Sequence, residues 1–289
     1  MADEPPRLDD VVSDLTDMPA LPTVVARLTR LIADPKTTAS DINHALLADP
    51  GLVTKILKLV NSPYYGFSRR ITTITNAVVI LGFNQVRNLA MSAYIFDAFA
   101  RRGSPLLDVD GLWRHSIGVA FMAAKIAKSI GSKGSKMEED AFICGLLHDL
   151  GKFIMNQKAP EHLGMVMETV GRDGVLFFEA EKLRLGYDHA ELGALILEKW
   201  NLPRAIVDVV RCHHNPMSAP RESLAQCCAV WTADVVSRAL LMGNGGDGGI
   251  PRLTPDVWRQ TGLDWKRLED IIRKVAAEYS KSDAFFSAT

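Results

Sequence analysis

The sequence has few cysteines and no long apolar run, and we expect it to carry no export signal. None of its four cysteines belongs to a Cys-x-x-Cys pair; they are Cys144, Cys212, Cys227 and Cys228. A structural zinc site built on thiolates is therefore disfavoured. The best apolar candidate, residues 117–130, is interrupted by two lysines and falls short of the roughly 20 apolar residues that span a membrane. Because residues 1–10 are acidic and polar, we expect a cytoplasmic protein with reduced thiols and no membrane contact.

The composition is that of an ordinary folded protein. The 289 residues are 47% hydrophobic and 23% charged, which excludes disordered, collagen-like and coiled-coil chains. The charge is uneven, because residues 1–18 hold six acids and one base, whereas residues 19–102 hold ten bases and four acids. These bases are scattered without aromatic interleaving. They favour a solvated helical surface, and nucleic-acid binding is disfavoured.

Helical periodicity runs through most of the chain, and no convincing alternating strand pattern exceeds four residues. The sequence therefore predicts an all-α protein. The expected helices cover residues 22–32, 50–60, 74–81, 84–99, 113–130, 138–156, 188–200, 203–214, 222–242 and 255–280. Pro22 and Pro50 suit first helical positions, and Gly82 suits a helix end.

A break in this pattern at residues 101–105 predicts a boundary between two helical lobes. We expect four parts in total. They are an acidic segment at 1–18, an N-terminal lobe at 19–102, a metal-binding lobe at 103–242, and a Gly-rich loop with a helical extension at 243–289. The loop is expected to be flexible, and without a lysine it is no P-loop.

Local signals mark several helix ends. Capping boxes are expected where Ser135 precedes Glu138 and where Asp188 precedes Glu191 by three residues. Asn61, at the end of the helix that begins at Pro50, is expected to bond free backbone groups and to tie the helix to the turn at residues 64–66. An exposed turn asparagine is the alternative.

Histidine placement is the most informative feature. His148-Asp149 falls inside an apolar helix, where an unpaired carboxylate is costly to bury and a metal ion would compensate that cost. Asp234 also lies on the core stripe of an apolar helix. The other candidates are His115, His189 and the pair His213-His214, all near helix ends. Imidazole and carboxylate suit Fe, Mn, Zn or Mg. Seven such groups exceed what one ion needs, so we expect two ions sharing a bridging carboxylate, an arrangement recurrent in phosphoester hydrolysis.

Each residue alone has a plainer interpretation. His115 or His189 could be a core or helix-end histidine satisfied by a hydrogen bond. His213-His214 could complement a helix dipole, and Asp234 could pair with Arg238 one turn later. The plainer interpretations weaken when the residues are taken together, because only two of the seven histidines stand outside the constellation.

The motifs resemble a known family. The pattern His115, His148-Asp149, Asp234 resembles the H…HD…D signature of the HD superfamily of metal-dependent phosphohydrolases, and the remaining histidines resemble the further ligands of its dinuclear, HD-GYP-type members. The N-terminal lobe resembles the HDOD domain, the HD-related output domain of bacterial signalling proteins. The motifs that carry this second resemblance are Leu21-Pro22, Asp49-Pro50, Asn61-Ser62, Tyr64-Tyr65-Gly66 and the Ile74, Ala77, Leu81-Gly82 series.

The resemblance covers residues 15–234 and implies an all-helical, two-lobed domain with a ligand assignment. One ion would be held by His115, His148, Asp149 and Asp234, and Asp149 would bridge to a second held by His189, His213 and His214. Lys152 matches a lysine that approaches substrate phosphate in HD-GYP enzymes, with a surface lysine as the alternative. Since residues 215–220, directly after the His pair, hold no acid and no Gly-Tyr-Pro segment, hydrolysis of cyclic di-GMP is disfavoured.

Two functions are open from the sequence. Members of the HDOD family are usually regulatory. The resemblance therefore favours a signalling module that binds a protein partner or a nucleotide and uses its metal ions as a structural clamp. The complete ligand set favours instead an active metal-dependent phosphohydrolase on a nucleotide or cyclic dinucleotide, with Asp149 and Lys152 as catalytic residues. An open coordination position facing a cleft would separate the two functions, since structural metal sites are closed.

Overall fold

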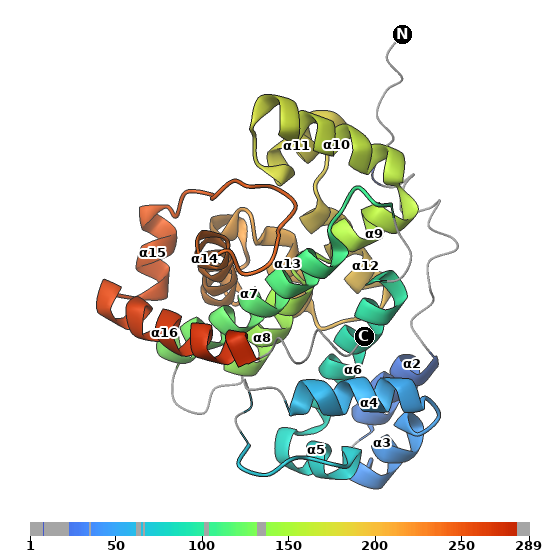
Figure 1. Cartoon of the computed structure of the whole chain (residues 1–289). Helices are drawn as coiled ribbons and strands as arrows, with labels where there is room; N and C mark the ends of the chain where they lie inside the picture. The colour runs from blue at the N-terminus through green and yellow to red at the C-terminus, as the bar shows by residue number, and fades with distance from the viewer. Residues whose placement is uncertain are drawn as a thin grey trace. The chain divides into compact units, whose positions relative to one another are not determined.

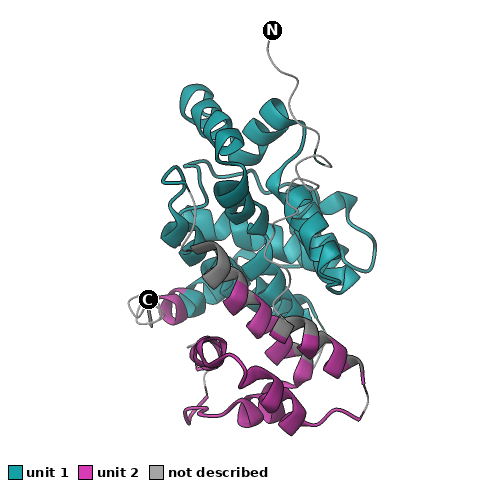
Figure 2. Ribbon diagram, turned by 90° about the vertical axis from the view of Figure 1, so that its right-hand side faces the viewer, with its two compact units in different colours: residues 1–17, 99–275 teal, residues 18–98, 276–289 magenta. Residues whose placement is uncertain are grey.

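The computed structural model describes residue 8 and residues 23–34, 36–61, 65, 67–100, 104–131 and 137–281. These residues form helices and no strand (Figure 1), which confirms the all-α prediction. None of the helices described is long and apolar enough to cross a membrane. The chain divides into two compact units, Met1–Asp17 with Phe99–Val275 as unit 1 and Met18–Ala98 with Ala276–Thr289 as unit 2 (Figure 2). The four-part division stays a prediction.

Unit 2 is a set of short helices around an apolar core. The helices are α2 (Thr23–Ala33), α3 (Ala39–Leu46), α4 (Pro50–Val60), α5 (Ile74–Leu81) and most of α6 (Phe83–Ala100). Side chains cap their starts: Asp49 accepts from the backbone of Leu52, and Thr73 accepts from that of Asn76. Pro50 is the first residue of α4 and Gly82 follows α5, both as predicted.

Asn61 closes the end of α4, through a partner that the sequence did not indicate. Its Nδ2 donates to the carbonyl oxygens of Leu57 and Ile71, each at 2.7 Å, and its Oδ1 accepts from the Ile71 N–H at 2.8 Å. Asn61 is half-buried, so the exposed alternative is wrong. The bonds tie α4 to the segment just before α5. Of the predicted turn partner at 64–66, only Tyr65 lies within the described residues.

Unit 1 is built around α7 (Val109–Ile130), which packs against α8 and α14 and is buried on nearly all sides between Gly111 and Ala127. Such a helix belongs to the centre of a bundle. The remaining helices are α8 (Met137–Leu147), α9 (Leu150–Lys158), α10 (Pro160–Asp173), α11 (Phe177–Leu185), α12 (His189–Lys199), α13 (Arg204–Cys212), the 3-10 turn η2 (Pro216–Ser218), α14 (Leu224–Ala239), α15 (Pro255–Thr261) and α16 (Trp265–Lys281), whose last residues group with unit 2.

The predicted helix over residues 138–156 is wrong at its centre. α8 ends at Leu147 and α9 begins at Leu150, so His148 and Asp149 form the turn between them. Asp149 occupies the position before α9 without capping it, so its carboxylate is available elsewhere. Gly151 allows the start of α12 to approach this turn, because a Cβ at that position would lie 2.0 Å from the His189 carbonyl oxygen.

Residues 157–187 hold two helices, α10 and α11, that the periodicity did not predict. α11 is nine residues long and begins with consecutive phenylalanines, so it shows no repeated apolar stripe. The chain then turns through Gly186 in the left-handed conformation (φ 77°). The predicted capping box of Asp188 and Glu191 is confirmed at the start of α12. Ser135, of the other predicted box, lies outside the described residues.

Candidate metal centre

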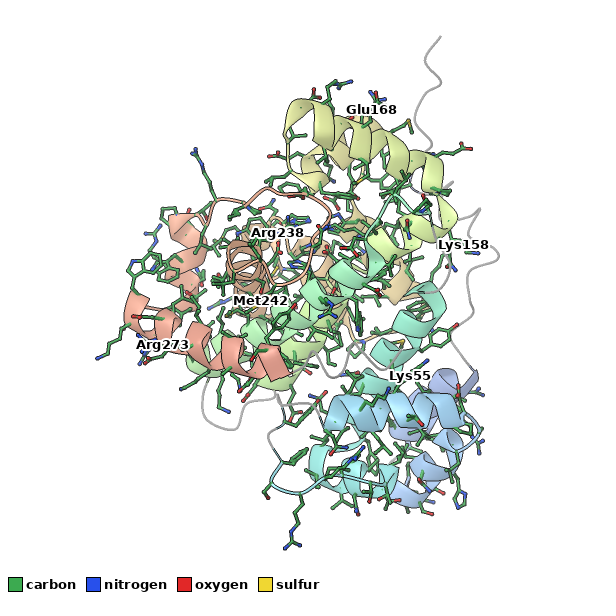
Figure 3. The ribbon with its side chains drawn as sticks, in the orientation of Figure 1. Lys55, Lys158, Glu168, Arg238, Met242 and Arg273 are labelled. Atoms are coloured by element: carbon green, nitrogen blue, oxygen red, sulfur yellow. The ribbon has the colours of Figure 1, made fainter. Side chains whose placement is uncertain are left out.

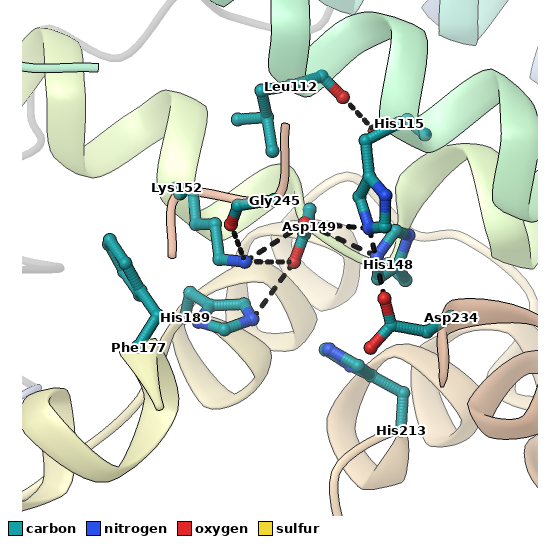
Figure 4. A network of polar contacts seen from close by, with 12 residues as sticks. Leu112, His115, His148, Asp149, Lys152, Phe177, His189, His213, Asp234 and Gly245 are labelled. Carbon is teal, nitrogen blue, oxygen red and sulfur yellow. Dashed lines mark hydrogen bonds and ion pairs between the residues drawn. The ribbon is translucent and has the colours of Figure 1, made fainter. Parts of the chain in front are cut away.

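The predicted ligand residues all lie in unit 1, and Figure 4 shows the side chains of those that it labels converging. Two sets of ligand atoms each gather within 4.8 Å: the first ligand group is His115, His148 and Asp149, and the second ligand group is His189, His213 and His214. They come from α7, the turn between α8 and α9, the first residue of α12 and the end of α13. All are buried except His214, which is partly exposed. Helix packing therefore brings together residues up to 99 positions apart.

Asp149 lies between the two groups. Its Oδ2 is 3.3 Å from His148 Nε2 and 3.9 Å from His115 Nε2. Its Oδ1 is 3.0 Å from Nε2 of His189, in the second ligand group. Asp234, on α14, places Oδ1 3.0 Å from His115 Nε2. One carboxylate thus faces both groups, and the other lies beside the first.

Two histidines are oriented by the backbone of the preceding turn. Nδ1 of His148 lies 2.7 Å from the Gly145 carbonyl oxygen, and Nδ1 of His213 lies 2.7 Å from that of Val210. A carbonyl only accepts, so each Nδ1 carries a proton, and in the neutral ring Nε2 is left to offer its lone pair to a metal. Within the described residues neither Nε2 has a hydrogen-bond partner, and Asp234 Oδ2 has none. Buried acceptors left in this state are costly, and a divalent ion would satisfy them, so the residues fit a metal.

His189 and His214 approach each other directly, with 2.8 Å between their Nε2 atoms. Phe178 stacks on the His214 ring, with centroids 4.2 Å apart and an interplanar angle of 18°. Trp231 meets the same ring edge-on at 5.7 Å. Aromatic packing therefore fixes the most exposed histidine of the second ligand group.

Lys152 is fully buried, so its interpretation as a surface lysine is wrong. Nζ lies 3.0 Å from both oxygens of Asp149 and donates to the Gly245 carbonyl oxygen at 2.7 Å (Figure 4). It also sits 4.9 Å from the centroid of the Phe177 ring. The ammonium group thus compensates the negative charge of the buried Asp149 carboxylate, and it also contacts the Gly245 carbonyl oxygen and the Phe177 ring.

Glu181 was missed from the sequence. It is fully buried on α11, and its Oε2 accepts from the backbone N–H of His189 at 3.0 Å and lies 2.5 Å from Nδ1 of the same residue. From the sequence, a glutamate in the segment Glu179-Ala180-Glu181-Lys182 is expected to lie on a solvent-exposed helix face. No spacing signal identified it, because its partner is on the next helix.

The Gly-rich residues 243–249, here called the cover loop, pack against the site. The N–H of Asn244 donates to the Gly111 carbonyl oxygen at 2.8 Å. Gly243 has φ 71°, and a Cβ there would lie 2.2 Å from the backbone nitrogen of His115, so only glycine allows this approach. Together with the Lys152 bond to Gly245, these contacts tie the cover loop to unit 1 instead of leaving it free in solvent.

Arg238 links the cover loop to the metal centre from the end of α14 (Figure 3). Its Nε is 2.9 Å from Oδ1 of Asp234, which confirms the one-turn pairing considered from the sequence. Its Nη1 is 2.9 Å from Oδ1 of Asp247, whose Oδ2 accepts from the Phe177 N–H at 3.0 Å. A cavity of about 460 Å³ is lined by His115, Arg238, Leu241 and residues 243–249.

The electrostatics of the site suit metal binding. Burial lowers the pKa of His115, His213 and His214, so these imidazoles are neutral at pH 7. Burial opposes ionisation of Asp149, but His148 and Lys152 hold the pKa of its carboxyl well below the usual range. Burial also disfavours the cationic form of His189, yet Glu181 raises its pKa to about 9. Metal ligands must be deprotonated, so His189 has to release a proton when an ion binds.

Comparison with known proteins identifies a family to which the chain is similar. The HDOD domain family model matches residues 18–216. An uncharacterized protein of Treponema pallidum (strain Nichols) is 30% identical over 234 residues, which are 80% of this chain and 44% of that protein. The chain thus spans less than half the length of this curated relative.

Two crystal structures are also similar. An HDOD domain protein of unknown function from Geobacter sulfurreducens superposes with a TM-score of 0.73 at 27% identity, covering 98% of this chain and 96% of the other. A Shewanella amazonensis SB2B protein, named provisionally as a phosphohydrolase, superposes with a TM-score of 0.70 at 22% identity, covering 94% and 97%; it supports the fold alone. With most of its length matched by the family model, the chain belongs to the HDOD domain family.

Proposed function

We propose that this chain is a regulatory HDOD module of a bacterial signalling protein and that it retains a dinuclear divalent-metal centre. The observation that carries the proposal is the placement of Asp149, with one carboxylate oxygen toward each ligand group. His115, His148, Asp149 and Asp234 would hold one ion, and Asp149 would bridge to a second held by His189, His213 and His214. The ligand set suits Fe, Mn, Zn or Mg.

A regulatory role is supported by how the site is closed. The cover loop is bonded to Lys152 and Arg238, and the residues that would contact a substrate phosphate are themselves buried. A structural metal site has no coordination position open to a substrate, and a loop held in this way would keep a substrate away from the ions. Bound ions would clamp α7, α12, α13 and α14 to the turn at Asp149. We propose that a signalling protein or a nucleotide binds to unit 1 in the conformation that the bound ions stabilise.

A metal-dependent phosphohydrolase is the alternative, and one observation favours it. His115 lines the same cavity as the cover loop, which would give a small phosphoester a route to the first ligand group. There the ions would supply charge neutralisation and water activation, with Asp149 and Lys152 as the catalytic residues. A nucleotide or cyclic dinucleotide other than cyclic di-GMP is the proposed substrate class.

Elemental analysis followed by an activity screen tests both proposals. The purified protein should bind about two transition-metal ions per chain, while His148→Gln should bind fewer. His44→Gln is the matched control, because His44 is exposed on α3 in unit 2. The metal-loaded protein is then screened with Mn²⁺, Fe²⁺ and Mg²⁺ against bis(p-nitrophenyl) phosphate, nucleotides and cyclic dinucleotides. Turnover that His148→Gln abolishes and His44→Gln retains would replace the regulatory function with the hydrolase. An absence of bound ions would contradict both.

A further inference from the structure

We infer that Glu181 is a positioning residue that holds His189 for the ion bound by the second ligand group. The inference rests on the proposed metal centre and adds to it a residue from α11, outside the ligand set. It predicts that the two ions depend on different supports, so that one ion can be weakened while the other is retained.

Glu181 holds His189 at two points. His189 is the first residue of α12, where a backbone N–H has no partner within its own helix. Oε2 of Glu181 accepts this N–H at 3.0 Å and also faces ring Nδ1 at 2.5 Å. With the backbone and Nδ1 both fixed, the imidazole has one orientation left. Its Nε2 lies 3.0 Å from Asp149 Oδ1 and 2.8 Å from His214 Nε2.

The chemistry of this contact differs from that of the other oriented histidines. His148 and His213 meet backbone carbonyl oxygens, which are neutral acceptors. His189 meets a carboxylate, which fixes the tautomer with the proton on Nδ1 and makes Nε2 a stronger electron donor. Glu181 therefore favours metal binding at His189 beyond what geometry alone provides.

Folding alone does not account for a buried glutamate at this position. Within the described residues its second oxygen, Oε1, has no hydrogen-bond partner. A buried charge that is only partly compensated destabilises a fold. A role toward His189 gives a reason for its presence.

The surrounding residues of α11 serve the same ligand group. Phe177 meets the His189 ring edge-on at 5.9 Å, and Phe178 stacks on His214 at 4.2 Å. Contact with one helix thus orients two of the three histidines in the second ligand group, whereas Asp234, beside the first, is supported by Arg238.

Competitive titration with Zn²⁺ against a chromophoric chelator tests the inference. Glu181→Gln keeps the shape and removes the charge, and Glu181→Leu removes both charge and hydrogen bond. Glu168→Gln is the matched control, because Glu168 is exposed on the neighbouring α10 (Figure 3). We expect two binding steps in the wild type and in the control. In Glu181→Gln one step should weaken about 10- to 100-fold, with the other unchanged and a larger loss in Glu181→Leu.

A long-range ¹H–¹⁵N spectrum of the histidine rings provides a second readout that general loosening of the fold would not reproduce. In the Zn²⁺-bound wild type the Nδ1 proton of His189 should resonate far downfield, as expected of a short hydrogen bond to the Glu181 carboxylate, and this shift should be lost in Glu181→Leu.

Two binding steps of wild-type affinity in a folded Glu181→Leu protein would overturn the inference. Equal weakening of both steps would also overturn it, since Glu181 would then act on the whole unit. A wild-type protein that binds no Zn²⁺ would instead refute the metal centre itself.

Discussion

The two units bury different kinds of residue. In the described part of unit 2 the core is apolar, with residues such as Leu28, Ile42 and Ile56, and the buried polar side chains are the amides Gln85 and Asn88. Unit 1 buries ionisable groups without exposure, among them Asp149 and Lys152. Apolar burial stabilises a unit by itself, whereas buried charges need partners. The comparison teaches that unit 2 is stable through packing, while unit 1 depends on what its polar residues bind.

The largest effect is expected when the central carboxylate, Asp149, is removed, because this tests directly whether unit 1 depends on bound metal. Asp149→Ala should abolish binding of both ions, because Asp149 faces both ligand groups. It should also leave the ammonium of Lys152 buried without its counter-charge, which destabilises unit 1 further. Elemental analysis of the purified variant measures the effect.

Asp270→Ala is the matched control, because Asp270 is exposed on α16; it should bind as many ions as the wild type. Full metal content in the Asp149→Ala protein would refute the bridging role.

Removal of the metal should destabilise one unit alone. Binding only to the folded state adds about 2.7 kcal/mol of stability at a hundredfold excess over the dissociation constant, and all seven proposed ligands lie in unit 1. All five tryptophans also lie in unit 1, so their fluorescence reports its unfolding. Chelation should lower the melting temperature seen by fluorescence. A melting temperature indifferent to chelation would show that unit 1 is stable without metal.

Asn61→Ala should destabilise unit 2 without changing metal binding in unit 1. The variant loses the bonds from Asn61 to Leu57 and Ile71 and leaves backbone groups at the end of α4 unsatisfied, at a cost of about 1 to 3 kcal/mol. Metal content should be unchanged. Denaturant unfolding followed by circular dichroism measures the loss, with Asn76→Ala as the control at an exposed position. A stable variant that loses a bound partner or nucleotide would instead place Asn61 on a recognition surface.

The sequence predicted the helices and the ligand residues better than it predicted their supports. Periodicity identified α4, α5 and α7, since each has an apolar face or a clear cap. His148 and Asp149 were identified as ligands, although their helix is interrupted there by a turn that packing against α12 accommodates. Glu181 and the cover loop were not recognised, because an acid on a short helix and a run of glycines each look solvent-exposed. Their contacts to His189, Lys152 and Arg238 are tertiary, and no local pattern encodes them.

The smallest expected effect is on thiol reactivity. All four cysteines lie in unit 1, so their alkylation reports how tightly this unit is packed with and without metal. Cys212 is partly exposed, whereas Cys144, Cys227 and Cys228 are buried. Burial raises the pKa of Cys228 to about 11, so at pH 8 about one molecule in a thousand carries the reactive thiolate. That fraction grows as pH rises toward 11, so alkylation should accelerate with pH. With iodoacetamide at pH 8, mass spectrometry should find Cys212 labelled first, and chelation should speed labelling of the buried thiols by loosening unit 1. Equal labelling of Cys212 and Cys228 in the metal-loaded protein would show that the core of unit 1 opens without metal loss.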